Sequence, residues 1–297
     1  MSEGELNTST EVAAVTPRFP GDPAAAAAVS RDCAQTTWRW AWICVLLAIA
    51  ASVALGVALS AANFGPNDDV AIVIGIFFIC VPIATAVFFF FRVYYHHRTA
   101  AMADACDTMN FRFTEKASKQ QLAAFTIFPL FKRGHACRGY YLMEGEVAGS
   151  SVCLMVYCYT TGHGKTAHVH SQTVVIVQAI DHLPDFELCP KGFWRKLGEI
   201  FGIMGITFHD NPKFAEAYDL QGADVKAIRA VFTPEAIAYF AANRDWTIEA
   251  KFGSVAIYQQ DKTCRPEACP ERVAVSLTMM RLLNPEVNAD SNLAASE

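Results

Sequence analysis

Two long runs of apolar side chains stand out against an otherwise mixed sequence. Between Trp40 and Ala62, 20 of 23 residues are hydrophobic, and between Val70 and Phe91 the count is 19 of 22. Neither run contains a charged side chain, and each has the ~20 residues that an α-helix needs to cross a hydrocarbon core of ~30 Å. The segment 63–69 that joins them is short and rich in turn-forming residues. The pattern therefore predicts a transmembrane helical hairpin.

Basic residues flank this hairpin at one end only. The arginines lie before the first run or after the second, and the connecting turn has no Lys or Arg; they are Arg18, Arg31, Arg39, Arg92 and Arg98. Short basic flanks stay on the cytoplasmic side of a membrane. We therefore expect a multi-pass protein of the bacterial inner (cytoplasmic) membrane with both termini in the cytoplasm, and the lipid bilayer as its first partner.

The first apolar run has small residues at every fourth position, namely Ala48, Ser52, Gly56 and Ser60. Small side chains on one stripe let helix backbones approach closely, so this stripe predicts a helix-packing face. Its partner is either the second span of the same chain or a second copy in a homodimer. Neither run carries an ionisable group, which argues against an ion path through the hairpin.

Beyond the hairpin, strand-like and helix-like patterns alternate. Alternating or β-branched apolar residues predict strands at 140–147, 151–160 and 166–179, and a hairpin of 246–251 with 255–260 around Gly253. Helical periodicity predicts helices at 191–202, 224–232, 234–243 and 270–283, the third of them capped by Thr233. Hairpin strands with helices between them favour an α+β domain with a mainly antiparallel sheet and flanking helices.

These patterns divide the chain into five segments. The expected order is a disordered tail at 1–37, two transmembrane helices with flanks at 38–98 (spans at about 40–62 and 70–91), a juxtamembrane helical linker at 99–124, a cytosolic α+β domain at 125–285, and a disordered tail at 286–297.

Charge and cysteine content narrow the class of protein. The 24 basic and 29 acidic residues give a net charge of −5, so the chain lacks the basic footprint of a nucleic-acid-binding protein. Ten cysteines are scattered without a repeating framework, which favours free thiols in a reducing compartment.

Short motifs in the predicted domain carry a resemblance. They are Gly145, Tyr157, Tyr159, Gln172-Thr-Val174, Leu183-Pro-Asp-Phe186, Leu188, Pro190, Phe208, Phe214, Tyr218, Leu220, Gly222, Phe232, Glu249 and Tyr258. From about Arg92 to Leu283, the chain resembles a bacterial family of membrane proteins with two N-terminal spans and a C-terminal cytosolic domain of unknown function. The resemblance implies the architecture and no particular activity.

The best metal candidates are Cys158, His168 and His170. Imidazoles two positions apart on a strand share a face, and a thiolate on the neighbouring strand completes three ligands for zinc. The three meet only if the strand register places Cys158 on the histidine face, since a one-residue slip sends it to the other face. The alternative is a polar sheet surface with a buried thiol and no cofactor.

Two basic groups are candidates for contact with anionic lipid. Lys191, Trp194, Arg195 and Lys196 combine cations with an aromatic ring, as membrane-surface helices do. The other group is Lys132, Arg133 and Arg138. For the first group, ordinary core packing with a solvated polar face is the competing interpretation.

Cys264 and Cys269 form a CxxxxC pair, and no second close pair accompanies it. Structural zinc sites usually combine two such pairs. Free thiols in a reducing cytoplasm are therefore the favoured interpretation, with a local disulfide as the alternative.

No GxSxG, HExxH or GxGxxG motif occurs in a suitable context, and catalytic residues are not predicted. The leading hypothesis is a non-enzymatic scaffold or partner-binding protein at the cytoplasmic face of the membrane, with a membrane protein as its partner. Two alternatives stand beside it: a membrane-anchored enzyme or metal-dependent sensor that uses residues 158–170, and an accessory subunit of a transporter complex.

Overall fold

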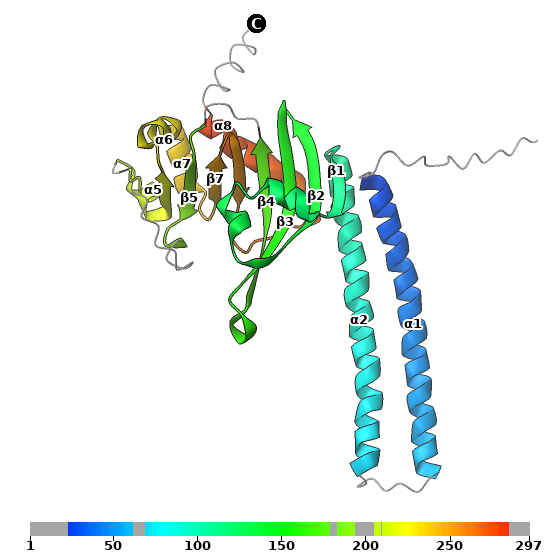
Figure 1. Ribbon diagram of the computed structural model, residues 1–297. Coiled ribbons are helices and arrows are strands. Elements are labelled where there is room, and N and C mark those ends of the chain that lie inside the picture. The colour runs from blue at the N-terminus through cyan, green and yellow to red at the C-terminus, as the bar shows by residue number, and fades with distance from the viewer. Residues whose placement is uncertain (1–22, 62–68, 179–182, 194–204, 209, 285–297) are drawn as a thin grey trace, which may run out of the picture.

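A computed structural model describes residues 23–61, 69–178, 183–193, 205–208 and 210–284, which form a pair of long helices and an α+β domain (Figure 1). Helices α1 (Pro23–Ala61) and α2 (Asp69–Thr108) lie side by side, and α2 leads directly into the domain. Pro82 lies inside α2.

The domain is built on an eight-stranded sheet in which every pair is antiparallel, in the order β1-β2-β3-β4-β8-β7-β5-β6. The strands are β1 (Arg112–Lys116), β2 (His135–Val147), β3 (Ser150–Thr161), β4 (His168–Gln178), β5 (Phe186–Pro190), β6 (Tyr218–Gly222), β7 (Thr247–Lys251) and β8 (Ser254–Tyr258). The α+β prediction with a mainly antiparallel sheet is thus confirmed. A bulge between Tyr140 and Met143 interrupts the register of β2, and Tyr141 there has a φ of 54°.

Short helices connect and cover the strands. They are α3 (Lys119–Ala124), α5 (Pro212–Ala217), α6 (Val225–Val231), α7 (Pro234–Ala242) and α8 (Cys269–Leu283), with 3₁₀ turns η1 (Pro129–Lys132), η2 (Gly164–Thr166) and η3 (Pro266–Ala268). The predicted cap of α7 is confirmed, because the Thr233 hydroxyl accepts a hydrogen bond from the Ala236 N–H at 3.3 Å. Ser118 and Gln121 form a capping box at the start of α3.

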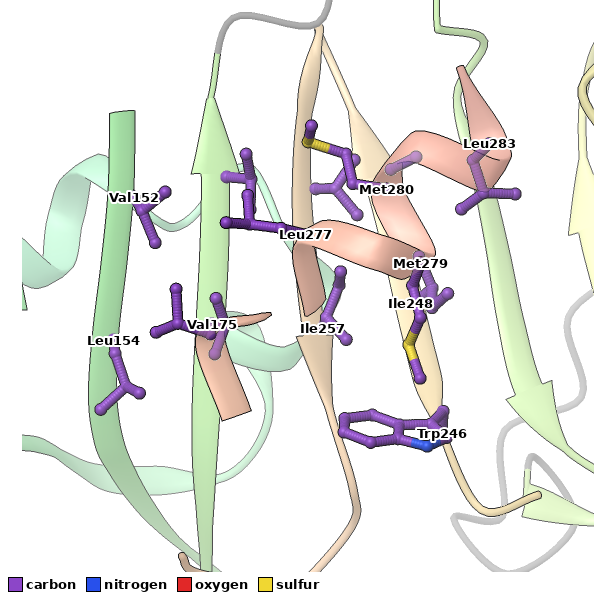
Figure 2. Packing of buried hydrophobic residues seen from close by; sticks show 14 of the residues in the cluster. Val152, Leu154, Val175, Trp246, Ile248, Ile257, Leu277, Met279, Met280 and Leu283 are labelled. Atoms are coloured by element: carbon purple, nitrogen blue, oxygen red, sulfur yellow. The ribbon is translucent and has the colours of Figure 1, made fainter. Parts of the chain in front are cut away.

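We call one side of the sheet the helix face, because α8 and the other late helices pack on it. Its apolar side chains include Val152, Leu154, Val175, Val177, Ile248, Val255 and Ile257, and Leu277, Met280 and Leu283 of α8 belong to the same buried cluster. Figure 2 shows the labelled side chains of the strands, such as Val175 and Ile257, and those of α8, such as Leu277, pointing toward one another. This cluster also contains Met102, Ala103 and Cys106 from the end of α2.

The opposite side, the loop face, is covered by α3, η1 and the turns between them. Its apolar cluster holds Ala117, Phe125, Phe128, Leu130, Phe131, Leu142, Cys153, Met155, Tyr157, Tyr159, Val174, Ile176, Ala256 and Tyr258. Strands β3 and β4 are therefore buried on both faces, which explains their nearly continuous apolar sequence.

The segment between hairpin and domain differs from its prediction. We expected a helical linker at 99–124, but α2 runs to Thr108 and residues 112–116 form the edge strand β1, in which Phe113 pairs with Met143. Phe113 is the only buried residue of β1, and its other residues are polar. A single buried side chain gives no alternating pattern by which the sequence could identify a strand. At the other end, α1 begins at Pro23, inside the tail expected at 1–37.

Besides β1, two strands and one helix have no counterpart in the prediction. β5 and β6 contain five residues each, and they include Pro190, Asp219 and Gly222, residue types that are rare in strands. Only pairing in the sheet identifies them as strands. α5 has six residues, too few for a clear helical period.

Candidate functional site

The helix pair exposes apolar side chains along both of its helices. Among the described residues, one helical stretch, Pro23–Ala54, is long and apolar enough to cross a membrane. In α2 the side chains of residues 69–75 and 77–79 lie outside the described part. Further along, Ile83, Phe88, Phe90 and Phe91 are each more than half exposed. The prediction of an apolar helix near the N-terminus that is long enough to cross a membrane is thus confirmed.

An apolar groove of about 590 Å³ lies between the two helices. Its lining residues are Trp38, Ala41, Trp42, Val45, Ala86, Val87, Phe89, Phe90 and Phe91. The predicted small-residue stripe lies further along α1: Ala48 and Ser52 are half-buried, whereas Gly56 is exposed and has open space where a side chain would project. The side chain of Ser60 lies outside the described part of the chain.

The three predicted metal ligands do not come together. The register pairs Cys158 with Ser171, whose hydroxyl lies 3.1 Å from the Cys158 sulfur. His170 is instead opposite Tyr159, on whose ring it stacks with a centroid distance of 4.8 Å. Because side chains alternate along a strand, Cys158 lies on the helix face while His168 and His170 lie on the other side. Within the described ranges, no group of three or more His, Cys, Asp or Glu side chains is arranged to hold a metal ion.

His170 takes part in a different cluster, at the open end of the loop face. Its Nδ1 lies 2.9 Å from a carboxylate oxygen of Asp261, and its Nε2 lies 3.0 Å from the hydroxyl of Thr161. Gln260 donates hydrogen bonds to the hydroxyl of Tyr159 and to Asp261. The carboxylate and the hydroxyl together fix the orientation of the imidazole. Asp261, in the left-handed region with a φ of 55°, could not have been assigned to this cluster from spacing alone.

Of the first basic group, which is residues 191 and 194–196, the structure describes Lys191 alone. Its side chain is exposed, and its Nζ lies 2.8 Å from Asp219 of β6. Trp194, Arg195 and Lys196, with most of the helix predicted at 191–202, lie outside the described residues.

The second basic group is divided by the fold. Lys132 and Arg138 are exposed, but Arg133 is buried and lies on the loop face of the sheet. Its guanidinium is 3.0 Å from Glu249 of β7, and the two side chains are 6% and 0% exposed. Arg133 therefore does not belong to a lipid-facing patch, because its charge is paired inside the domain.

The buried pair is completed by neutral groups. The Tyr258 hydroxyl accepts a hydrogen bond from Arg133 at 2.9 Å and donates one to Glu249 at 2.8 Å. The backbone N–H of Leu130, in η1, donates to the second carboxylate oxygen of Glu249 at 3.0 Å. The ring of Phe193 lies 5.0 Å from the Arg133 guanidinium, at cation–π distance. We call Arg133, Glu249 and Tyr258 the buried triad.

Burial raises the pKa of Glu249, and Arg133, the Leu130 N–H and the Tyr258 hydroxyl act in the opposite direction. Burial also raises the pKa of Tyr258, which stays a protonated donor. Arg133 is charged at any ordinary pH. The network thus holds one buried cation against a carboxylate whose ionised form receives three hydrogen bonds.

A second carboxylate stands beside the triad. Glu187 of β5 is directly opposite Glu249 of β7 in the register, an arrangement that repels when both are ionised. Lys251 compensates, with its Nζ 3.2 Å from Glu187. Glu249 and Glu187 therefore each have their own cation. Sequence reasoning missed this group of charged residues and Tyr258, because its members come from four separate segments of the chain. Tyr157, Tyr159 and Gln172 lie on the same face of the sheet. Together with Glu249 and Tyr258, they are among the residues that carry the family resemblance.

A smaller groove, of about 310 Å³, runs along the outer edge of the sheet beside β6. Residues that line it include Lys191, Ile206, Phe208, Phe214, Asp219 and Gln221. The main chain at Gly205 forms a bridge with Gln221, and the Ile206 N–H donates to the Leu220 carbonyl at 2.8 Å. Segment 205–206 thus pairs with the edge strand and forms one wall of the groove.

Comparison with known proteins gives little to set beside this geometry. No protein-family model matches the chain, and no curated protein sequence matches it. Among solved structures, the chain is similar to the crystal structure of the mycobacterial trehalose monomycolate transport factor A, TtfA, with 10% sequence identity and a TM-score of 0.44. The match covers 62% of this chain and 91% of that one.

Proposed function

We propose that the protein is a two-span membrane protein, with both termini in the cytoplasm, whose domain binds a membrane-protein partner at the bilayer surface. One observation carries this proposal. Helix α2 is continuous from Asp69 to Thr108; it exposes apolar side chains in its middle part and ends inside the core of the domain.

The distances along α2 support a position of the domain close to the membrane. Phe91 is 63% exposed, whereas Ala100 and Met102 are 3% and 0% exposed. Ala100 lies nine positions after Phe91, which is about 14 Å at the helical rise of 1.5 Å per residue. A helix of this kind holds the domain at a set height and orientation, as a scaffold or an accessory subunit requires.

Further contacts support a fixed junction. Tyr95 of α2 donates a hydrogen bond to Glu115 of β1 at 2.7 Å. Arg31 of α1 pairs with Asp104 of α2 at 2.9 Å, on the surface, and Ala27 of α1 is fully buried. The domain is therefore attached to both helices, rather than to the end of one.

The groove between α1 and α2 is the surface that we assign to the partner. Aromatic rings of Trp38, Trp42 and Phe90 flank the small side chains of Ala41 and Ala86. Small residues beneath bulky ones allow another helix to approach closely within a membrane. The proposed occupant is a transmembrane helix of a partner protein.

Photo-crosslinking in native membranes tests this assignment. A photoreactive amino acid is placed at Ala41 or Ala86 of the full-length chain, with the same amino acid at Ile49 as a control on the exposed surface of α1. We expect one discrete membrane-protein adduct from the groove positions and none from Ile49. Identical patterns at all three positions, or release of the protein from membranes by alkaline carbonate, would contradict the proposal. If the adduct is a transporter, the protein is its accessory subunit.

The orientation has a separate test. Cys137 is an exposed thiol of the domain. A membrane-impermeant maleimide added to intact cells should leave Cys137 unlabelled until the membrane is permeabilised, and a Cys137→Ser variant measures the background. Labelling of Cys137 in intact cells would place the domain outside the cytoplasm.

A further inference from the structure

Two cysteines next to the α2 junction lie within reach of one another. The sulfurs of Cys264 and Cys269 are 3.3 Å apart, and both are free thiols. They flank the 3₁₀ turn η3, and Cys269 is the first residue of α8. A disulfide has a sulfur–sulfur distance of about 2.05 Å, so closing this bond requires a movement of roughly 1.3 Å.

The surroundings of the two thiols are unequal. The Thr173 hydroxyl on β4 donates to the Cys264 sulfur at 3.4 Å and accepts from the Cys264 N–H at 2.8 Å. Cys264 keeps 6% of its surface exposed, whereas Cys269 is completely buried. Cys264 is therefore the sulfur that an external reagent meets.

The acidities of the thiols differ in the same sense. The hydrogen bond from Cys269 lowers the pKa of Cys264 to about 6 in spite of burial, with help from Thr173 and the charge of Arg272. The same interaction and burial raise the pKa of Cys269. The charged and titratable groups that face the pair are Arg272 on α8 and Cys106 on α2. A thiolate beside a protonated thiol is the arrangement of an attacking and a resolving cysteine.

The pair also touches the anchor helix. The Cys269 sulfur lies 3.8 Å from the sulfur of Met102 on α2, and η3 packs against α2. A bond between the cysteines would close the loop that contains η3, and so would fix one of the contacts that hold α2.

We propose that Cys264 and Cys269 form a reversible dithiol–disulfide site that reacts with low-molecular-weight disulfides and stiffens the junction between α2 and the domain. In the first step the Cys264 thiolate attacks a sulfur of the disulfide RSSR, which gives a mixed disulfide and releases RS⁻. Cys269 then loses its proton and attacks the Cys264 sulfur, which closes the internal disulfide and releases a second RS⁻. Two protons from the protein thiols end on the two RS⁻ groups, so the dithiol is oxidised and RSSR is reduced to two RSH.

The test uses the full-length protein in detergent micelles, glutathione disulfide as the reagent, and peptide mass mapping. We expect wild type to form the internal Cys264–Cys269 disulfide. Cys269→Ser should stop at a glutathione adduct on Cys264, and Cys264→Ser should give about tenfold less adduct on Cys269. Cys137→Ser removes an exposed, competing thiol and should leave the internal disulfide unchanged. Glutathione on Cys137 with no internal disulfide in wild type would overturn the proposal.

Two further measurements need no variant. The rate at which the Cys264 thiol is consumed by glutathione disulfide should rise as pH increases through about 6 and level off by neutral pH, because Cys264 becomes a thiolate over that interval. A rise centred near the ordinary thiol pKa of ~8.5 would refute the attacking role of Cys264. Hydrogen exchange at residues 267–268 and 100–108 should be slower in the oxidised protein. Equal exchange in both redox states would overturn the link to α2.

Discussion

The two faces of the central sheet are both buried, but by different chemistry. On β8, Ile257 points into the helix face among aliphatic side chains, and the next residue, Tyr258, points into the loop face and binds a buried ion pair. Both residues are fully buried. The difference shows that burial alone does not determine whether a face of this sheet is apolar.

The cause lies in what covers each face. α8 and the other helices satisfy their own backbone hydrogen bonds, so they need only apolar side chains beneath them. Residues 117–133 cover the loop face as two short helices, α3 and η1, joined by turns. The first N–H groups of such short helices have no partner within the helix and require partners from elsewhere. Glu249 supplies one for Leu130, and Arg133 from the same segment balances its charge. The ion pair is thus part of the way an irregular segment is held on a sheet.

The strongest test of this comparison removes the cation from the loop face. Arg133→Met should lower the free energy of unfolding by about 3–5 kcal/mol, because Glu249 is left buried without a counter-charge. Urea unfolding of the full-length protein in micelles, followed by near-ultraviolet circular dichroism, measures the change. Lys132→Met, at the exposed neighbour, should alter it by less than about 0.5 kcal/mol. Equal effects of the two variants would mean that the triad does not stabilise the fold.

A cavity on the helix face provides the apolar counterpart. Leu154→Ala should cost about 3 kcal/mol, since Leu154 is fully buried and the removed methyl groups leave a void against its neighbours. The same urea experiment applies. Val169→Ala, at a position that is 73% exposed on β4, is the control, and it should change stability little. A Leu154→Ala loss below about 1 kcal/mol would show that this face is loosely packed.

Substitutions at two adjacent residues of β8 allow a direct comparison of how each face contributes to stability. Tyr258→Phe keeps the ring and removes a hydroxyl that bridges Arg133 and Glu249, so we expect a loss of about 1.5–3 kcal/mol. Ile257→Val, one residue away on the other face, should lose about 1 kcal/mol. If Tyr258→Phe is as stable as wild type, the ion pair satisfies itself and the hydroxyl is dispensable.

The smallest effect is expected at the open end of the loop face. Asp261→Asn weakens the contact with His170, and it should reduce stability by no more than about 0.5 kcal/mol because the Asp261 side chain is 52% exposed. His170→Gln provides a second removal of the same contact. A loss of stability as large as that of Arg133→Met would mean that His170 and Asp261 stabilise the fold as strongly as the buried triad does.

Individual residues show which structural features a sequence pattern can predict. The hairpin around Gly253 and the cap at Thr233 were predictable, because each depends on neighbours within a few positions. The buried triad was not, because Arg133 and Glu249 are 116 residues apart and nothing local distinguishes Arg133 from the exposed Lys132. The proposed metal site depended on a strand register, and the register separates Cys158 from the histidines.

By itself, the sequence determined the apolar helices near the N-terminus, the α+β class and most strands of the sheet, since hydrophobic periodicity and turn residues act over short distances. The tertiary structure alone decided which segments share a face: that β1 belongs to the sheet, that α2 ends in the domain core, that Arg133 is paired and buried, and that Cys264 lies beside Cys269 with Met102 against them. These outcomes depend on how segments far apart in the chain pack together, and no local pattern contains that information.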